Sequence, residues 1–216
     1  MNILISGGTG FLGSRLAELA RAAGHHPVIL TRHPDTRPRQ PGIDFAGWDG
    51  SSVGSIVPLM ENADAVVNLA GENLGGGRWT PARKRRIMES RSRATGALVE
   101  AMAASGRRPR VLISASAMGI YGNTGAERIT ETHPPGHGFL AEVCTAWEDA
   151  ALHARPLGVR VVLPRLGLIL GPRGGALRKM VVPFRLFLGG HLGPGTQWIS
   201  WVHRDDAAEA FLFCMN

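Results

Sequence analysis

Three evenly spaced glycines lie near the start of the chain, in the stretch ISGGTGFLGSRLAELARAAGH. Gly7, Gly10 and Gly13 follow a short apolar run and precede an amphipathic one. In a strand-to-helix turn, the first glycine permits a tight turn, the second lets the backbone approach a phosphate, and the third lets helix and strand pack closely. The helix amino terminus then presents free N–H groups to an anion. The spacing predicts a pyrophosphate-binding loop, with an ordinary turn as the simpler alternative.

The second apolar run ends in LTRHP, which places Arg32 just after the expected strand. An acidic residue at this point would bind the ribose 2'-hydroxyl of NAD, whereas a guanidinium suits the 2'-phosphate of NADP. We therefore expect NADP(H) to be preferred over NAD(H). An ordinary surface arginine is the alternative, because arginine supplies almost all of the positive charge of this chain.

Short apolar runs alternate with helical patterns along most of the chain. The runs are NILIS from Asn2, PVILT from Pro27, IDFAGW from Ile43, DAVVNLAG from Asp64, RVLISAS from Arg110 and VRVVLPRLGLIL from Val159. A helix is expected over residues 11–23, and a long one after Thr80 as N-cap and Pro81 as first residue, with Gly106 as its stop. This alternation predicts an α/β protein with a doubly wound parallel sheet of the Rossmann type.

The alternation of apolar runs and helical patterns ends after Gly171. A glycine-rich connection, a short strand-like stretch over 198–202 and a closing helix follow. We expect an NADP-binding domain over residues 1–170 and a small, partial substrate-side lobe over 171–216. Trp198 and Trp201 alternate with apolar neighbours, a pattern more typical of core than of a sugar-stacking surface.

Composition narrows the classes of function. The formal net charge is +7, and the densest basic run is Arg83–Arg86. No aromatic residues interleave with that run, so a solvated helix face is favoured over a nucleic-acid surface. Cys144 and Cys214 lack metal-type spacing and are expected to be buried free thiols, with no metal site. The apolar run 3–5 is far too short to span a membrane, so a cytoplasmic protein without membrane contact is expected.

Five stretches occur in the order GGTGFLG, NLAGENLGGGRWT, SASAMGIYG, RLGLILGPRGGAL and WVHRDD. With them the chain resembles the short-chain dehydrogenase/reductase superfamily, and more narrowly its atypical, extended branch of nucleoside-diphosphate-sugar-epimerase-like proteins. The resemblance covers essentially the whole chain. It implies that Thr9, Phe11 and Leu12 accompany the glycines of the phosphate loop, and that Asp49 lies near the adenine.

The same resemblance implies a turn behind the cofactor ribose, made by Asn68, Leu69, Ala70 and Gly71. It also implies that Ser114 or Ser116, at the end of the fifth strand, faces the nicotinamide and the substrate. From the residue pattern alone, SAS at a strand end more often marks small residues that pack near a turn.

Active members of the superfamily usually carry Y-x-x-x-K on the following helix, where the lysine lowers the pKa of the tyrosine. Here that helix has Phe139 or Leu140 at the tyrosine position and Val143 or Cys144 at the lysine position. Tyr121 is the only phenol in the chain. It is either a catalytic residue at the substrate end of the cleft or a packing residue in a turn.

Other polar residues are weaker candidates. Glu148 is expected at the surface, and Arg165 is expected either to bind a substrate anion or to pair with a carboxylate. His203 and Asp205 are expected to be structural, because residues two apart at a helix start do not face one another. Relatives continue past the helix that starts near Arg204, so an open pocket and a homodimer through an uncovered apolar helix are also expected.

The leading functional hypothesis is an NADP(H)-dependent, epimerase-like oxidoreductase acting on a small carbonyl, alcohol or sugar-type substrate. Ser114, Ser116 and Tyr121 are its catalytic candidates. The alternative is an NADP(H)-binding regulatory or sensor protein that has lost catalysis, which the missing Y-x-x-x-K pair favours. Nucleic-acid binding through Arg83–Arg86 is a third hypothesis.

Overall fold

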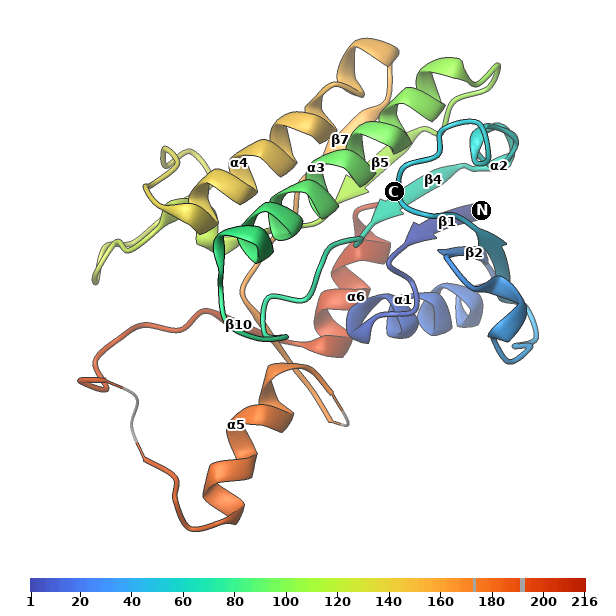
Figure 1. Ribbon diagram of the computed structural model, residues 1–216. Helices are drawn as coiled ribbons and strands as arrows, with labels where there is room; N and C mark the ends of the chain where they lie inside the picture. Colours follow the sequence, from blue (N-terminus) through green and yellow to red (C-terminus); the bar gives the residue numbers. More distant parts are fainter. Residues whose placement is uncertain (173, 191–192) are drawn as a thin grey trace.

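The computed structural model describes residues 1–172, 174–190 and 193–216. Its centre is a parallel sheet with the strand order β3-β2-β1-β4-β5-β7 (Figure 1). The strands are β1 (Asn2–Ser6), β2 (His26–Thr31), β3 (Asp44–Gly47), β4 (Ala65–Asn68), β5 (Val111–Ser114) and β7 (Arg160–Val162). Strands β2 and β3 are added on one side of β1, and the chain then crosses to the other side to add β4, β5 and β7. The carboxyl ends of β1 and β4 therefore border the crevice where nucleotides bind in such sheets.

Helices cover both faces of this sheet, as the sequence predicts. One face packs against α1 (Phe11–Ala22) and α6 (Arg204–Phe213). The other packs against α2 (Val57–Asn62), α3 (Pro81–Ala104) and α4 (Phe139–Leu152), with α3 and α4 side by side (Figure 1). Short 3₁₀ turns, η1 (Pro34–Thr36), η2 (Met118–Tyr121) and η3 (Arg155–Leu157), complete the connections.

The alternating geometry of β1 distributes its apolar residues between the two cores. Ile3 and Ile5 belong to the core beneath α1 and α6, whereas Leu4 belongs to the core beneath α2 and α3. Successive side chains of a strand point to opposite faces, so a continuous apolar run suits a strand covered on both sides.

The long apolar run from Val159 to Leu170 is not one strand. Only β7 joins the main sheet; β8 (Arg165–Leu166) pairs with β6 (Ser116–Ala117), and β9 (Leu168–Leu170) pairs with β10 (Trp201–His203). Pro164 has no N–H to donate to a ladder, and a side chain at Gly167 would lie 2.6 Å from the Ser200 carbonyl oxygen. These two residues redirect the chain away from the sheet.

The long helix α3 begins as predicted. Thr80 Oγ1 accepts a hydrogen bond of 3.3 Å from the backbone N–H of Arg83, and Pro81 occupies the first helical position. The helix ends at Ala104, with Ser105 as its C-cap, one residue before the predicted stop at Gly106.

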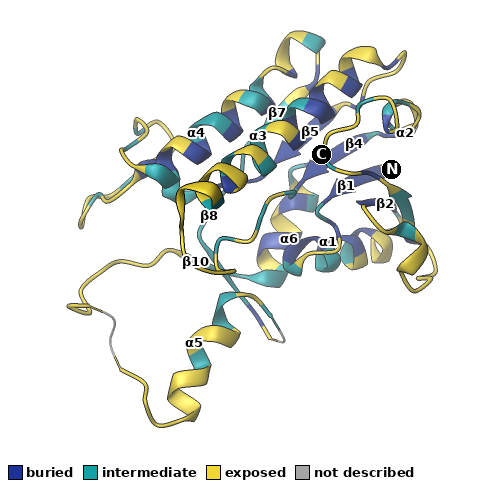
Figure 2. Cartoon of the chain, viewed as in Figure 1, coloured by how far each residue is buried: buried dark blue, intermediate teal, exposed yellow. Residues whose placement is uncertain are grey.

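Residues after Gly171 divide between two places. Helix α5 (Gly175–Arg185) projects away from the sheet and is largely exposed (Figures 1 and 2). Helix α6 returns to pack against α1, with Phe211 fully buried, so residues 204–213 lie with the sheet rather than with α5. Trp198 and Trp201 are 81% and 63% exposed, so the prediction that they are core residues is wrong for the described part of the chain.

Both cysteines are free thiols, with Cys144 buried and Cys214 half-buried. The described residues contain no group of three potential metal ligands. Within the same residues, every helix is too short or too polar to cross a bilayer.

Candidate functional site

A cleft of about 820 Å³ lies at the carboxyl ends of β1, β2 and β4. One wall is formed by the glycine loop and the residues after β2 and β3, and the other by the loop after β4 and one face of α3. The lining residues are Gly7, Thr9, Gly10, Leu30, Thr31, Arg32, His33, Arg37, Trp48, Asp49, Gly50, Ser51, Leu69, Ala70, Gly71, Glu72, Asn73, Arg86, Glu89, Ser90, Arg93 and Ala94. Its volume is typical of a small-molecule or cofactor site.

The glycine loop has the shape that a pyrophosphate cradle needs. Gly7 has a φ of +70°, and a Cβ there would lie 2.6 Å from the Leu69 carbonyl carbon. A Cβ at Gly13 would lie 2.5 Å from the Gly7 carbonyl oxygen. Gly10 is the N-cap of α1 and provides no side-chain cap, which leaves the first N–H groups of the helix available to an anion. The residues present therefore fit a dinucleotide.

The structure separates the predicted cofactor residues into two sets. Those lining the cleft are Gly7, Thr9, Gly10, Arg32, Asp49, Leu69, Ala70 and Gly71. Phe11, Leu12, Gly13 and Asn68 do not line it, and of these Leu12, Gly13 and Asn68 are buried. Side chains added at Gly174 or Gly175 would meet the Phe11 ring within 3 Å, so this ring anchors the segment that leads into α5.

Asn68 supports the cleft floor through a buried hydrogen-bond network. Its Oδ1 accepts from Ser6 Oγ at 2.7 Å, and its Nδ2 donates to Thr95 Oγ1 at 2.8 Å and to Ser114 Oγ at 3.1 Å. Oδ1 also accepts from the backbone N–H of Ala70, which lines the cleft. The network ties β1, β4, β5 and α3 together at the carboxyl ends of the strands. Ser114, fully buried, contributes its hydroxyl to this support.

The charged residues that follow β2 and β3 differ in how far they are already hydrogen-bonded. Arg32 and Arg37 are exposed and line it after β2. Asp49 follows β3, but both its carboxylate oxygens accept hydrogen bonds from Ser51 and Ser52, at 2.6–3.1 Å. The hydrogen bonds from Ser52 and then Ser51 hold the pKa of Asp49 well below its usual range. Its carboxylate therefore closes a local turn, while the two guanidinium groups remain available.

The α3 wall was not predicted from the sequence. Arg86, Glu89, Ser90, Arg93 and Ala94 line the cleft with spacings of three and four residues, which place them on one helix face. That spacing was visible in the sequence, but nothing in it showed which face α3 turns toward β4.

The run Arg83–Arg86 is therefore not a uniformly solvated face. The side chain of Arg83 is only 12% exposed, Lys84 Nζ lies 5.1 Å from the centroid of the Phe139 ring, and Arg86 lines the cleft.

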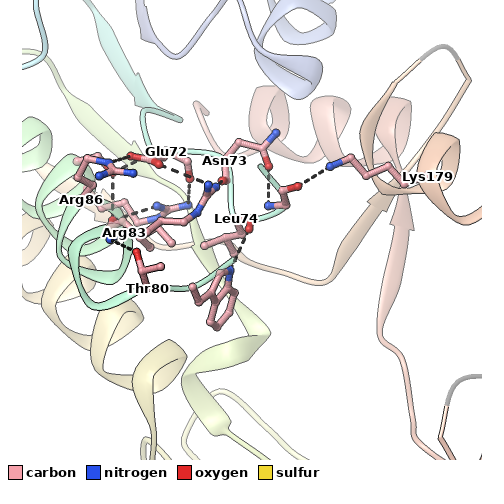
Figure 3. A network of polar contacts seen from close by, with 12 residues as sticks. Glu72, Asn73, Leu74, Thr80, Arg83, Arg86 and Lys179 are labelled. Carbon is pink, nitrogen blue, oxygen red and sulfur yellow. Dashed lines mark hydrogen bonds and ion pairs between the residues drawn. The ribbon is translucent and has the colours of Figure 1, made fainter. Parts of the chain in front are cut away.

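The Glu72 cluster, formed by Glu72, Arg83 and Arg86, joins this wall to the loop after β4 (Figure 3). Arg86 Nε lies 3.4 Å from Glu72 Oε2, and Arg83 Nη2 lies 3.9 Å from Glu72 Oε1. Arg83 Nη2 also donates to the Asn73 carbonyl at 2.6 Å. Farther along the same loop, Lys179 of α5 donates to the Gly75 carbonyl (Figure 3). The loop is thus held from both sides.

A second network connects two of the three catalytic candidates. Arg165 Nε and Nη2 donate to the two oxygens of Glu148 at 2.9 and 2.8 Å. Ser116 Oγ donates to Glu148 Oε1 at 2.5 Å, and Arg165 Nη1 donates to Tyr121 Oη at 2.6 Å. Glu148 is 6% exposed, so its predicted surface position is wrong. Of the two roles expected for Arg165, pairing with a carboxylate is the one observed.

Tyr121 faces a second cavity of about 410 Å³ rather than the main cleft. The other residues around it are Met118, Ile129, Thr130, Glu131, Leu163, Pro164 and Arg165. Because the phenol oxygen accepts from Arg165, its own proton is left for another acceptor. Ser116 is 2% exposed, with its hydroxyl bound to Glu148. Ser116 and Tyr121 therefore share one ion pair, whereas Ser114 belongs to the Asn68 network.

The residues at the expected tyrosine and lysine positions are apolar or buried. The Phe139 ring packs edge-on against Trp79 at 5.5 Å. Cys144 is buried, and burial raises the pKa of its thiol. The positive charge of Arg91, on α3, acts on the Cys144 thiol. The Arg91 guanidinium lies 5.1 Å from the Trp147 ring centroid, and burial lowers its pKa. Arg91 Nη2 donates to the Glu72 carbonyl and so supports the cleft wall from behind.

His203 and Asp205 are structural, as predicted. The His203 ring accepts from the backbone N–H of Asp205 at the start of α6. Asp205 pairs with Arg15 of α1 at 2.9 Å, which joins the two helices on one face of the sheet.

Comparison with known proteins agrees with this geometry. The sequence model of the NAD dependent epimerase/dehydratase family matches residues 3–216. The chain belongs to this family. Curated relatives include epimerase family proteins of Staphylococcus aureus strain MW2, 40% identical over 214 residues, and of Staphylococcus haemolyticus, 42% identical over 216 residues. Each match covers 99% of this chain and 70% of the relative.

Solved structures of epimerase family proteins share the fold. Human epimerase family protein SDR39U1, solved with NADPH, is 29% identical with a TM-score of 0.82, over 100% of this chain and 70% of that one. A nucleoside-diphosphate sugar epimerase from Corynebacterium glutamicum is 35% identical with a TM-score of 0.80, over 98% of this chain and 43% of that one. The resemblance to the atypical, epimerase-like branch of the short-chain dehydrogenase/reductase superfamily is confirmed, as is the Rossmann-type fold.

Proposed function

We propose that this epimerase-family chain binds NADP(H) in preference to NAD(H). One observation carries the proposal: Arg32 and Arg37 face the cleft after β2, while both carboxylate oxygens of Asp49 already accept hydrogen bonds from two serines. A 2'-phosphate would meet two guanidinium groups there, whereas a 2'-hydroxyl would meet a carboxylate whose oxygens already accept hydrogen bonds from serines. The human epimerase family protein was solved with NADPH, which supports binding of NADP(H) by this chain.

Calorimetric titration with NADPH and NADH tests this proposal. We expect the unmodified protein to bind NADPH at least about tenfold more tightly, the scale of one or two charge-assisted hydrogen bonds. Arg32→Asp should reverse or abolish that preference, and Arg37→Gln should reduce it. Arg39→Gln, which changes a neighbouring arginine outside the cleft lining, is the control. Equal affinities of the unmodified protein for the two nucleotides would contradict the proposal.

We further propose an epimerase-like oxidoreductase reaction on a small carbonyl, alcohol or sugar-type substrate. A bound nicotinamide would supply hydride transfer. The chain itself would supply the proton at Tyr121 Oη, because that oxygen is fixed by Arg165 and its proton is left for an acceptor in the second cavity. Ser116 would act through Glu148 and Arg165 as a positioning residue. A cytoplasmic location, where NADPH is available, is part of this proposal.

The alternative is a nucleotide-binding sensor without turnover. Two observations favour it: the hydroxyls of Ser114 and Ser116 are buried and committed to other protein groups, and α4 carries no Y-x-x-x-K pair. NADPH oxidation in the presence of aldehydes, ketones and nucleotide sugars separates the two functions. Turnover that depends on Tyr121 supports the enzyme; tight NADPH binding without turnover on any of them supports the sensor.

A further inference from the structure

The Glu72 cluster is a charged group beside the cleft that the nucleotide preference does not use. Arg86 is 58% exposed and its only described carboxylate partner is Glu72, at 3.4 Å. Arg83 is 12% exposed and held by the Asn73 carbonyl, and its Nε is buried without a hydrogen-bond partner among the described residues. The cluster therefore contains one fixed arginine and one that can change partners (Figure 3).

The backbone of Glu72 is fixed, so the cluster has a defined place. Its N–H donates to Ser90 Oγ at 3.0 Å, and its carbonyl accepts from Arg91 at 3.2 Å. On the cleft lining, Glu72 and Glu89 are balanced by Arg86 and Arg93, and Arg83 beside Glu72 adds one further positive charge. A carboxylate at the wall of an anion site would repel the ligand, so the two neighbouring guanidinium groups are needed to reverse the sign of the potential there.

The position of the cluster indicates which part of a nucleotide it meets. Glu72 follows Leu69 and Gly71, and Leu69 is the residue whose backbone closes against Gly7 of the glycine loop. The cluster thus follows β4, the strand beside β1, whereas Arg32 follows β2 on the far side of β1. In strand order, the glycine loop after β1 therefore lies between Arg32 and the Glu72 cluster. Across the cleft, the cluster is on the wall that faces the glycine loop.

We propose that Arg86 is a phosphate-binding residue for the pyrophosphate of the dinucleotide, held ready by Glu72 until the nucleotide arrives. This inference rests on the proposed nucleotide binding and adds a second, independent set of charges to it. Arg32 and Arg37 would recognise the 2'-phosphate that distinguishes NADP(H). Arg86 would contact the group that NADP(H), NAD(H) and ADP have in common.

Four probes separate these contributions: NADPH, NADH, ADP and adenosine 2'-monophosphate. We expect Arg86→Gln to weaken binding of NADPH, NADH and ADP by about tenfold each, because each carries the pyrophosphate. The affinity of Arg86→Gln for adenosine 2'-monophosphate should stay within twofold of that of the unmodified protein. Arg85→Gln changes the adjacent exposed residue, which does not line the cleft, and is the matched control. Arg86→Lys, which keeps the charge, should lose less affinity than Arg86→Gln.

Two results would overturn the proposal. Unchanged affinities for NADH and ADP in Arg86→Gln would show that this residue does not bind the pyrophosphate. Losses confined to NADPH and adenosine 2'-monophosphate would assign Arg86 to the 2'-phosphate instead. Equal binding of NADPH and NADH by the unmodified protein would contradict the nucleotide preference, yet the NADH and ADP titrations would still test Arg86. Thermal unfolding without nucleotide checks that all three variants remain folded.

Discussion

Arg165 and Glu148 form a two-point ion pair that joins β8 to α4, with N–O distances of 2.9 and 2.8 Å. The Glu148 side chain is 7% exposed and that of Arg165 is 22% exposed. The hydrogen bonds to Glu148 are the main reason that the pKa of Arg165 is raised above its ordinary value. The pair also fixes Ser116 on one side and Tyr121 on the other.

Breaking this pair from one side should destabilise the protein. Arg165→Met leaves a buried carboxylate without its partner, so we expect the free energy of unfolding to fall by about 3 kcal/mol. Urea unfolding at pH 7 measures this. The double variant Arg165→Met with Glu148→Leu removes both charges and should recover much of the loss. A loss well below about 1 kcal/mol in the single variant would show that the pair is only a weak surface contact.

Removal of one oxygen from Tyr121 should separate chemistry from binding. Tyr121→Phe keeps the ring but removes the proton donor facing the second cavity, so any NADPH-dependent turnover should fall about 100-fold or more. NADPH affinity should not change, because Tyr121 lies outside the main cleft. Steady-state kinetics and calorimetry measure the two quantities. Unchanged turnover in this variant would reduce Tyr121 to a packing residue.

Two glycine-to-alanine substitutions should have opposite effects on stability. At Gly13 the new methyl group would lie 2.5 Å from the Gly7 carbonyl oxygen and 2.7 Å from Gly8 Cα, so backbone must move, at a cost of about 1–3 kcal/mol. At Gly96, inside α3, the methyl group meets nothing within 4 Å and lowers the entropy of the unfolded chain, which should stabilise by about 0.5–1 kcal/mol. Chemical denaturation of both variants measures the difference. If Gly13→Ala were as stable as the unmodified chain, the close packing of the loop would be wrong.

Asp64 should contribute a pH-dependent part of the stability. The backbone N–H of Asn2, and then Arg107, hold its pKa below the ordinary value of 3.8. A depressed carboxyl pKa stabilises the folded state above the unfolded-state pKa, and this contribution is lost as the pH falls through the folded-state pKa. The difference in free energy of unfolding between the unmodified protein and Asp64→Asn should therefore be constant above about pH 5 and shrink below pH 3.8.

Urea unfolding at several pH values between 2 and 7 measures that difference. Arg107→Gln should remove only part of the same pH dependence, since the N–H of Asn2 still donates to Asp64. A difference that did not change over this range would contradict the assignment.

Local sequence was enough to predict the sheet, its helices and the tight glycine loop between β1 and α1. The loop depends on three residues within one turn, and the strands on short apolar runs, so each can be recognised without knowing the rest of the chain. The alternation of the elements predicted a parallel sheet covered on both faces, and the structure supplied the strand order. The expectation that residues 159–170 form one strand was wrong, because the structure divides them into β7, β8 and β9. That division depends on Pro164 and on the approach of Ser200 from a distant segment.

The sequence by itself determined the fold, the glycine cradle and Arg32 at the end of its strand, because these follow from periodicity and from residues close together along the chain. Only the tertiary structure decided that Glu148 is buried against Arg165, that Ser114 supports Asn68, and that Arg86 turns to the cleft. The first and the last depend on how a helix is rotated against the sheet, and the second depends on the register of β4 and β5. That rotation is set by the packing of many apolar side chains at once, and a polar residue on the helix carries no local signal of it.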